Sequence, residues 1–295
     1  MKLVFFDRMD NDGRGALAVF DRYAKDEKLL YAPIGLDRDM NNKDGKHYIN
    51  VLLDYIGNNP KVTEVIFMDL APRTLLECQA VWNILEPLAI SLKIIDHHNL
   101  PYFVSDISEG ITYVYEKGVS ACMLTWKHYF PNMKAPYVIE LINDRDVWIN
   151  KLQPDTNYFY NTFGMMNQTE LNNLVVTVSE IDLNSWLAIG KIREESTIKP
   201  TIQGLVNSCE VVEWNGYKIA VPMKDISPEY VSEVGNKACK QYECDFFCTM
   251  FQKGNSWGYG LRSLNGQALK FIRDNNFKGG GHPNACGFTH DKRLF

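Results

Sequence analysis

The chain has 295 residues, of which 45% are hydrophobic and 23% charged, and its formal net charge at pH 7 is −5. This length fits two domains that each bury a core, and the negative charge argues against a duplex-DNA binder, which would carry a basic face. No apolar run is long enough to cross a membrane and no secretion signal precedes the first strand-like segment, so we expect a cytoplasmic protein that acts away from membranes.

The first half of the chain alternates between apolar, strand-like runs and segments with helical character. The expected strands are residues 2–6, 29–34, 64–70 and 93–96. The expected helices are residues 15–25, 48–56, 74–85 and 121–129. A further apolar run, 137–142, leads to Asp144-Arg145-Asp146. Such alternation predicts an α/β domain in which helices cover both faces of a parallel sheet.

The second half is helical at first and then changes character. Residues 149–208 are mostly helical and more polar, and 185–208 is the expected connector. The elements expected after it are a hairpin at 211–222 around Asn215-Gly216, a helix at 228–242, paired strands at 245–251 and 257–262, and a short helix at 267–273. The predicted domains are therefore 1–184, a helical connector at 185–208, and a smaller mixed α/β domain at 209–295. The seven scattered cysteines form no CxxC pair, and we interpret them as reduced thiols.

Acidic and imidazole side chains follow three of the expected strands. Asp10 and Asp12 come after the first strand, Asp69 directly follows the apolar run that ends at Met68, and Asp96-His97-His98 closes a later strand. The carboxyl ends of parallel strands meet at one crevice, so these residues can share a site. Crowded carboxylates need cations, and oxygen ligands with imidazoles suit Mn²⁺ or Mg²⁺ better than a structural Zn²⁺. The pattern predicts a metal-dependent hydrolase or transferase.

Each of these motifs also has an ordinary interpretation on its own. Asp10 and Asp12 alone are typical of a solvated turn before a helix, and Asp69 alone is typical of a helix cap. Asp144 and Asp146 with the arginine between them could form a surface ion-pair cluster, and spacing alone leaves either one as a last metal ligand. The combination favours the metal site.

A glycine-rich motif near the end of the chain lies in basic surroundings. Residues 253–282 contain five lysines and arginines and a single acid, Asp274. We expect Gly279-Gly280-Gly281-His282 to form a turn whose backbone amides and imidazole bind a phosphate or carboxylate, with Arg262 as a bidentate partner. A flexible turn without a ligand is the alternative. Candidate base-stacking aromatics are Tyr102, Phe103 and Trp257.

Together these motifs resemble the DHH phosphoesterase family with its DHH-associated carboxy-terminal domain. The matching pieces are Asp10-x-Asp12-Gly13, Asp69, Asp96-His97-His98, Asp144, Leu261-Arg262-Ser263 and Gly279-Gly280-Gly281-His282 with Ala285 and Gly287-Phe288. They occur in the expected order over almost the whole chain. The resemblance implies a parallel-sheet DHH domain joined by a helical connector to a mixed α/β domain. Members include RecJ exonucleases, nano-RNases, cyclic-dinucleotide phosphodiesterases and, with a different second domain, family II pyrophosphatases.

The resemblance also implies roles for individual residues. One Mn²⁺ would be held by Asp12, Asp69, His97 and Asp144. A second would be held by Asp10 and the bridging Asp69, with Mg²⁺ as the alternative ion. The substrate phosphate would be held by His98, Arg262, Gly280, Gly281 and His282. Asp69, His97 and His98 are accordingly the expected catalytic residues.

Two positions in this assignment depart from the family or leave a choice. Asp144 is preferred over Asp146 because the family commonly has an aromatic residue four positions beyond the ligand, as Trp148 is here. Many members have a histidine where this chain has Arg8, which cannot bind a cation, and the adjacent Asp7 is the candidate substitute.

The expected activity is Mn²⁺-dependent hydrolysis of short single-stranded oligonucleotides or small nucleotides to nucleoside monophosphates. Two ions would activate a water molecule and stabilise charge on the phosphoryl group. The alternatives are a phosphodiesterase or phosphatase for cyclic dinucleotides or 3′-phosphoadenosine 5′-phosphate (pAp), and a non-catalytic nucleotide sensor that has lost one metal. A pyrophosphatase is disfavoured by the glycine-rich motif. The expected partner is the nucleotide substrate, without membrane or duplex DNA, and a homodimer is a possible assembly.

Overall fold

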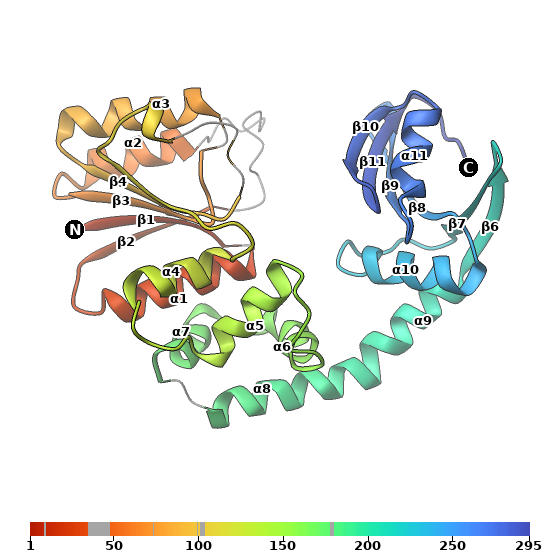
Figure 1. Ribbon diagram of the computed structural model, residues 1–295, viewed down its shortest axis with the longest axis horizontal. Coiled ribbons are helices and arrows are strands. Elements are labelled where there is room, and N and C mark those ends of the chain that lie inside the picture. The colour runs from red at the N-terminus through yellow and green to blue at the C-terminus, as the bar shows by residue number, and fades with distance from the viewer. Residues whose placement is uncertain (9, 35–47, 73, 99, 101–103, 178–179) are drawn as a thin grey trace. The chain divides into compact units, whose positions relative to one another are not determined.

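The computed structural model describes all residues except 9, 35–47, 73, 99, 101–103 and 178–179 (Figure 1). The chain forms two compact units, Met1–Lys191 and Ile192–Phe295. The boundary lies within the segment 185–208, for which we expect a helical connector. That segment is covered by α8 (Glu180–Arg193), the π-helical segment η3 (Glu194–Ile198) and α9 (Lys199–Asn207).

The first unit contains the predicted parallel sheet, which has five strands. Its strands are β1 (Lys2–Asp7), β2 (Leu29–Ile34), β3 (Glu64–Met68), β4 (Ser91–Ile95) and β5 (Ile111–Val114). The order is β2-β1-β3-β4-β5, and every neighbouring pair is parallel. After β1 the chain adds β2 on one side and later β3 on the other, so the order reverses next to β1. Ligands bind at such a switch point, outside the carboxyl ends of the strands.

Helices cover both faces of this sheet, as Figure 1 shows. The helices before α8 are α1 (Asn11–Tyr23), α2 (Tyr48–Asn58), α3 (Leu75–Leu85), α4 (Ala121–Tyr129), α5 (Tyr137–Asp146), α6 (Asp155–Phe163) and α7 (Gln168–Thr177), with the short 3₁₀ segments η1 (Glu86–Leu88) and η2 (Val104–Asp106). α2 and α3 lie on one face of the sheet and α1 and α4 on the other, while α5, α6 and α7 form a further layer beyond α1 and α4. Successive β1 residues alternate between two cores. Val4 belongs to the core that α1, α4, α5, α6 and α7 also line, whereas Leu3 and Phe5 belong to the core that α2 and α3 line.

The second unit is built on a six-stranded mixed sheet. Its elements are β6 (Cys209–Trp214), β7 (Tyr217–Pro222), α10 (Val231–Tyr242), β8 (Phe246–Lys253), β9 (Ser256–Arg262), α11 (Gln267–Asp274), β10 (Lys278–His282) and β11 (Ala285–His290). The order is β10-β11-β9-β8-β7-β6, and only β7 and β8 pair in parallel. The predicted hairpin turns at Asn215 (φ 47°) and Gly216 (φ 79°), the positive φ values that a tight hairpin favours.

The glycine-rich motif differs from the expectation, because it is not a turn. Residues 278–282 form the edge strand β10, in which Gly280 pairs with Gly287 and Gly281 with Cys286 of β11. Glycine is needed here because the backbones of β10 and β11 pack closely against each other. A Cβ atom at position 279 would lie 2.2 Å from the carbonyl oxygen of Gly287, so only glycine fits there.

Two neighbouring glycine substitutions are therefore expected to differ. Gly279→Ala should lower the free energy of unfolding by about 1–3 kcal/mol, the usual cost of overpacking. Gly280→Ala should change it by less than about 0.5 kcal/mol, because a Cβ atom at that position meets nothing within 4 Å. Thermal and denaturant unfolding of the two variants would measure the difference. Equal losses of stability would contradict the close-packing explanation.

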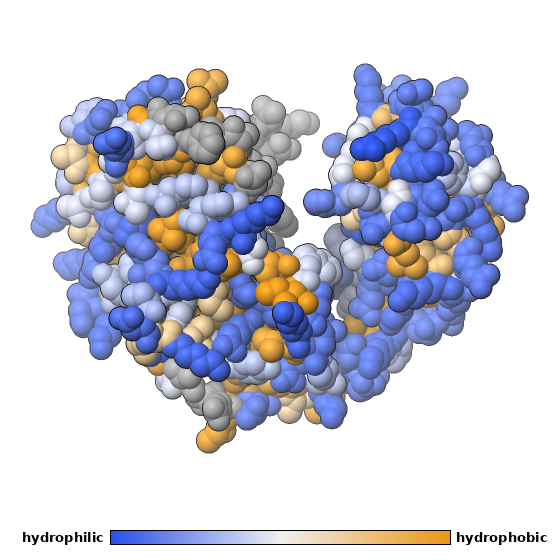
Figure 2. Space-filling model, viewed as in Figure 1, coloured by the Kyte–Doolittle hydropathy of each residue, from blue (hydrophilic) through white to orange (hydrophobic). Residues whose placement is uncertain are grey.

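Two observations concern the surface. No helix in the part of the chain that the structure describes is both long enough and apolar enough to cross a membrane. On the face shown in Figure 2, hydrophilic residues cover most of the coloured surface, and hydrophobic residues occur in small groups.

Candidate metal centre

The first acidic motif is held at the start of α1. The Asp10 side chain caps this helix by accepting a hydrogen bond from the Asp12 backbone N–H at 2.9 Å. The fully buried Asp12 carboxylate accepts from the backbone N–H groups of Ala121 and Cys122, at the start of α4. A Cβ atom at Gly13 would lie 2.4 Å from the Asp7 carbonyl oxygen. Glycine therefore permits the tight path from β1 into the helix.

Asp69 follows β3 and is the most unusual residue of the site. Its φ is 54°, a left-handed conformation that non-glycine residues rarely adopt, and it is 1% exposed. It is not the cap of α3, because Thr74 caps that helix. Among the described residues, none donates a hydrogen bond to either carboxylate oxygen of Asp69. Buried carboxylate oxygens without donors are costly, and a bound cation would compensate them.

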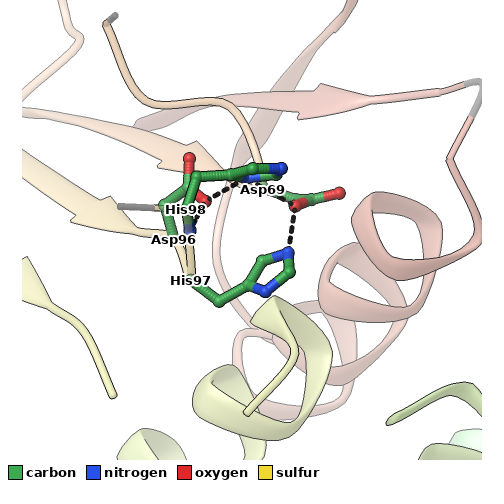
Figure 3. A group of neighbouring side chains, drawn as sticks. All are labelled: Asp69, Asp96, His97 and His98. Atoms are coloured by element: carbon green, nitrogen blue, oxygen red, sulfur yellow. Dashed lines mark hydrogen bonds and ion pairs between the residues drawn. The ribbon is translucent and has the colours of Figure 1, made fainter. Parts of the chain in front are cut away.

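The imidazole of His97 lies among three carboxylates (Figure 3 shows its contact with Asp69). Its Nε2 is 3.4 Å from Oδ2 of Asp146, 3.5 Å from Oδ1 of Asp69 and 3.8 Å from Oδ2 of Asp12. These carboxylates come from α5, the end of β3 and α1. Segments far apart in the sequence thus meet at the switch point of the sheet.

Asp96 fixes the second imidazole, as Figure 3 shows. Its carboxylate accepts hydrogen bonds from the backbone N–H groups of Ala71 at 2.6 Å and His98 at 2.9 Å. It also contacts Nδ1 of His98 at 2.8 Å. Burial would raise the Asp96 pKa, but the hydrogen bonds and charge of His98 outweigh it and lower the pKa. Asp96 is therefore the ionised acceptor, and Nδ1 of His98 donates.

The structure brings Asp146, and not Asp144, to the cluster. The Asp144 carboxylate accepts hydrogen bonds from the Lys151 and Leu152 backbone N–H groups at 2.8 and 3.3 Å and from the Thr156 hydroxyl at 2.6 Å. It holds the loop after α5. The Oδ2 atom of Asp146 is buried near His97 and accepts no hydrogen bond from a described residue. The geometry therefore favours Asp146, whereas the sequence-based preference was for Asp144, and the metal ligand at this position stays a prediction.

The two aspartates lie on different faces of α5. Asp146 lies four residues after Ile142 and seven after Ile139, which places all three on one face of the helix. Ile142 and Ile139 belong to the same buried core as α1, but so does Leu141, three residues before Asp144. The helical period alone therefore does not decide between the two aspartates.

The remaining predicted residues lie elsewhere. Within the described residues, candidate ligand atoms gather in two groups that share His97: Asp12, His97 and Asp146, and Asp69, Asp96, His97 and His98. Asp7 is buried and accepts a hydrogen bond from the Asp10 backbone N–H, while Arg8 is exposed; neither belongs to a group. Arg262, Gly280, Gly281 and His282 lie in the second unit. Tyr102 and Phe103 lie outside the described residues.

Burial and mutual repulsion shift the pKa values of the clustered carboxyl groups upward. Burial, and then the charges of Asp12 and Asp10, raise the pKa of Asp69 well above its usual range. The same causes raise the pKa of Asp146 to about 8. Burial also raises the Asp12 pKa and lowers the His97 pKa. The site thus favours proton uptake or cation binding, and its oxygen-rich donor set fits Mn²⁺ or Mg²⁺.

These shifts predict that the metal-free protein loses stability as the pH rises from about 4 to about 8. An aspartate in the unfolded chain has a pKa near 3.9, whereas that of folded Asp146 is about 8. Between these values the folded state binds more protons than the unfolded state, so the free energy of unfolding falls with rising pH.

Thermal unfolding in a chelator at pH 5, 6.5 and 8 would measure this effect. Added Mn²⁺ should raise Tm more at pH 8 than at pH 5, because the ion competes with protons. Asp146→Asn should show a weaker pH dependence. A metal-free Tm that is flat or rises across this range would contradict the assignment.

We compared the sequence and the fold of the chain with those of known proteins. No protein-family model matches the chain. The uncharacterized protein R106 of Acanthamoeba polyphaga mimivirus is 28% identical over an alignment of 309 residues, which covers 97% of this chain and 67% of that protein. A structure of exonuclease RecJ bound to manganese aligns at 12% identity with a TM-score of 0.52, covering 98% of this chain and 86% of that one. The structure of a DHH domain from a member of a family of ribosomal proteins aligns at 14% identity with a TM-score of 0.54, covering 98% and 83%.

Proposed function

Since this chain has the fold of the DHH-domain proteins, we propose that it is a metal-dependent phosphodiesterase that hydrolyses short oligonucleotides or small nucleotides to nucleoside monophosphates. The observation that carries this proposal is Asp69, whose two buried oxygens accept no hydrogen bond from described residues and lie beside His97. A carboxylate in this position could bind two metal ions at once, one through each oxygen.

The proposed ligand set follows the geometry of the cluster. One ion would be held by Asp12, Asp69, His97 and Asp146, because Nε2 of His97 lies 3.4–3.8 Å from a carboxylate oxygen of each aspartate. A second would be held by Asp10 with Asp69. Mn²⁺ is the first choice, because the similar exonuclease RecJ structure binds manganese, and Mg²⁺ is the alternative. When bound, such ions activate water and stabilise charge on a phosphoryl group.

The chain's own residues would then bind and orient the substrate. Asp96 accepts from Nδ1 of His98, and the His98 side chain is 52% exposed. Its Nε2 can therefore face a substrate phosphate and supply a hydrogen bond or a proton there. The backbone hydrogen bonds to Asp96 hold the imidazole in this orientation.

The second unit has a groove of its own that suits a nucleotide. It has a volume of about 1090 Å³, and its lining includes Trp257, Gly260, Arg262 and Arg293. Arg262 donates to the Ser232 hydroxyl at 3.0 Å, which fixes the guanidinium. Two arginines beside an aromatic ring suit a phosphate linked to a base. Because β10 is an edge strand, Gly280 and Gly281 with His282 remain proposed anion contacts.

The test is hydrolysis of a 5′-labelled dinucleotide, pAp, a cyclic dinucleotide and pyrophosphate, each with Mn²⁺, with Mg²⁺ and with chelator. We expect metal-dependent release of mononucleotides from the dinucleotide and none with chelator. A preference for pAp or the cyclic dinucleotide would select that alternative within the same chemistry. Hydrolysis of pyrophosphate alone would refute a phosphodiesterase.

A nucleotide sensor is the second candidate, and the first motif is the observation that favours it. Arg8 is exposed, and the neighbouring Asp7 carboxylate accepts a hydrogen bond from the backbone of Asp10. The first motif thus offers one ligand fewer than the family pattern. Binding of the dinucleotide in Mn²⁺ without turnover would support the sensor and exclude the enzyme.

A further inference from the structure

A stack of two aromatic rings and one guanidinium adjoins the acidic cluster. The guanidinium carbon of Arg145 lies 4.9 Å from the ring centroid of Trp148 and 4.8 Å from that of Tyr160. Arg145 directly precedes Asp146, and Trp148 follows it by two residues. Arg145 thus joins the stack directly to Asp146, a proposed metal ligand.

The outer ring of this stack is held in an exposed position. Trp148 is 65% exposed, and its φ of 55° is left-handed, a conformation that is unfavourable for a bulky residue. The Asp144 carbonyl accepts from the backbone N–H groups of Ile149 and Asn150, and its carboxylate accepts from that of Lys151. These hydrogen bonds fix the loop, so the structure presents the indole to solvent rather than burying it.

The arrangement of the stack defines what the indole could bind. Arg145 occupies one face of the ring and leaves the other for a ligand. A flat π-system is the ligand that fits an indole face. In a nucleotide, a single ribose joins the base to the phosphate. When the phosphate lies at the acidic cluster, the base must therefore lie close by, among the residues next to the cluster.

We propose that Trp148 stacks on a nucleobase of the substrate and makes the site selective for nucleoside phosphodiesters over phosphates that lack a base. This inference rests on the proposed function and specifies its substrate class. Because every base has a π-face, selection by stacking would tolerate different base sequences. Arg145, whose guanidinium contacts both Trp148 and Tyr160, acts as a positioning residue for the indole.

The experiment compares Trp148→Ala with Trp148→Phe on the dinucleotide pApA and on its abasic analogue. The alanine variant should raise KM for pApA roughly tenfold or more, within the range for loss of one base–aromatic stack, and leave kcat unchanged. It should not alter hydrolysis of the abasic analogue, and phenylalanine should restore most of the affinity. Tyr23→Ala is the matched control, because Tyr23 is a 46% exposed aromatic at the opposite end of α1 from Asp12. Equal effects on both substrates, or none, would overturn the inference.

A binding measurement separates this inference from the proposed function. Quenching of tryptophan fluorescence by pApA should be larger in the wild type than in Trp148→Phe, and Trp148→Ala should weaken pApA binding. If the wild type binds pApA in this way without hydrolysing it, the stacking role stands and the enzymatic proposal falls. If pApA is hydrolysed and neither KM nor quenching depends on Trp148, the stacking role falls alone and the exposed ring serves another partner.

Discussion

Replacing Asp69 by asparagine is expected to lower phosphodiester hydrolysis by about a thousandfold or more while the protein stays folded. Loss of a bridging carboxylate would remove several kcal/mol of metal-dependent stabilisation, and each 1.36 kcal/mol is a factor of ten in rate. Asparagine retains the size of the side chain and lacks the charge. Steady-state turnover of a dinucleotide in Mn²⁺ would measure the loss.

The same variant should be more stable than the wild type without metal at pH 8. Burial, and then the charges of Asp12, Asp10, Asp96 and Asp146, raise the pKa of Asp69, so replacing it by a neutral side chain removes both the burial of a charge and the repulsion. Mn²⁺ should raise Tm of the wild type, because it binds only the folded state, and should raise that of the variant much less. Full turnover by a folded Asp69→Asn protein would refute the bridging role.

Most of the first sheet could be predicted from the sequence, because its buried strands are continuous apolar runs. Residues Leu3–Phe6 and Val65–Met68 are buried on both faces of the sheet, which is the reason for their uniform hydrophobicity. The edge strand β5 was not predicted. It has four residues, and only Ile111 among them is buried, so it lacks the pattern of an interior strand.

The glycine-rich motif shows where local composition is insufficient. Three consecutive glycines are typical of a turn, but tertiary packing against β11 places them in a strand. Sequence reasoning also singled out Asp12, Asp69, His97 and His98, which lie in the two groups that share His97. It left the choice between Asp144 and Asp146 to the family pattern, which favoured Asp144, because the choice depends on which face of α5 packs beside α1. That contact joins residues far apart in the chain.

Substitution of these two aspartates should give opposite results. Asp144→Asn is expected to lower the free energy of unfolding by about 2–3 kcal/mol, because its carboxylate accepts two backbone hydrogen bonds and one from Thr156. It should still bind Mn²⁺. Asp146→Asn should leave the metal-free protein as stable as the wild type or more stable, and should lower turnover about a hundredfold or more.

Calorimetric titration with Mn²⁺, together with denaturant unfolding and turnover, would separate the two roles in a matched pair of variants on one helix. Oδ2 of Asp146 lies 3.4 Å from His97 and accepts no hydrogen bond from described residues, so asparagine there leaves few interactions unsatisfied. At Asp144, asparagine offers an N–H₂ group to a site built from donors. Loss of Mn²⁺ binding in Asp144→Asn with retention in Asp146→Asn would restore the family-based assignment and move the metal to the loop after α5.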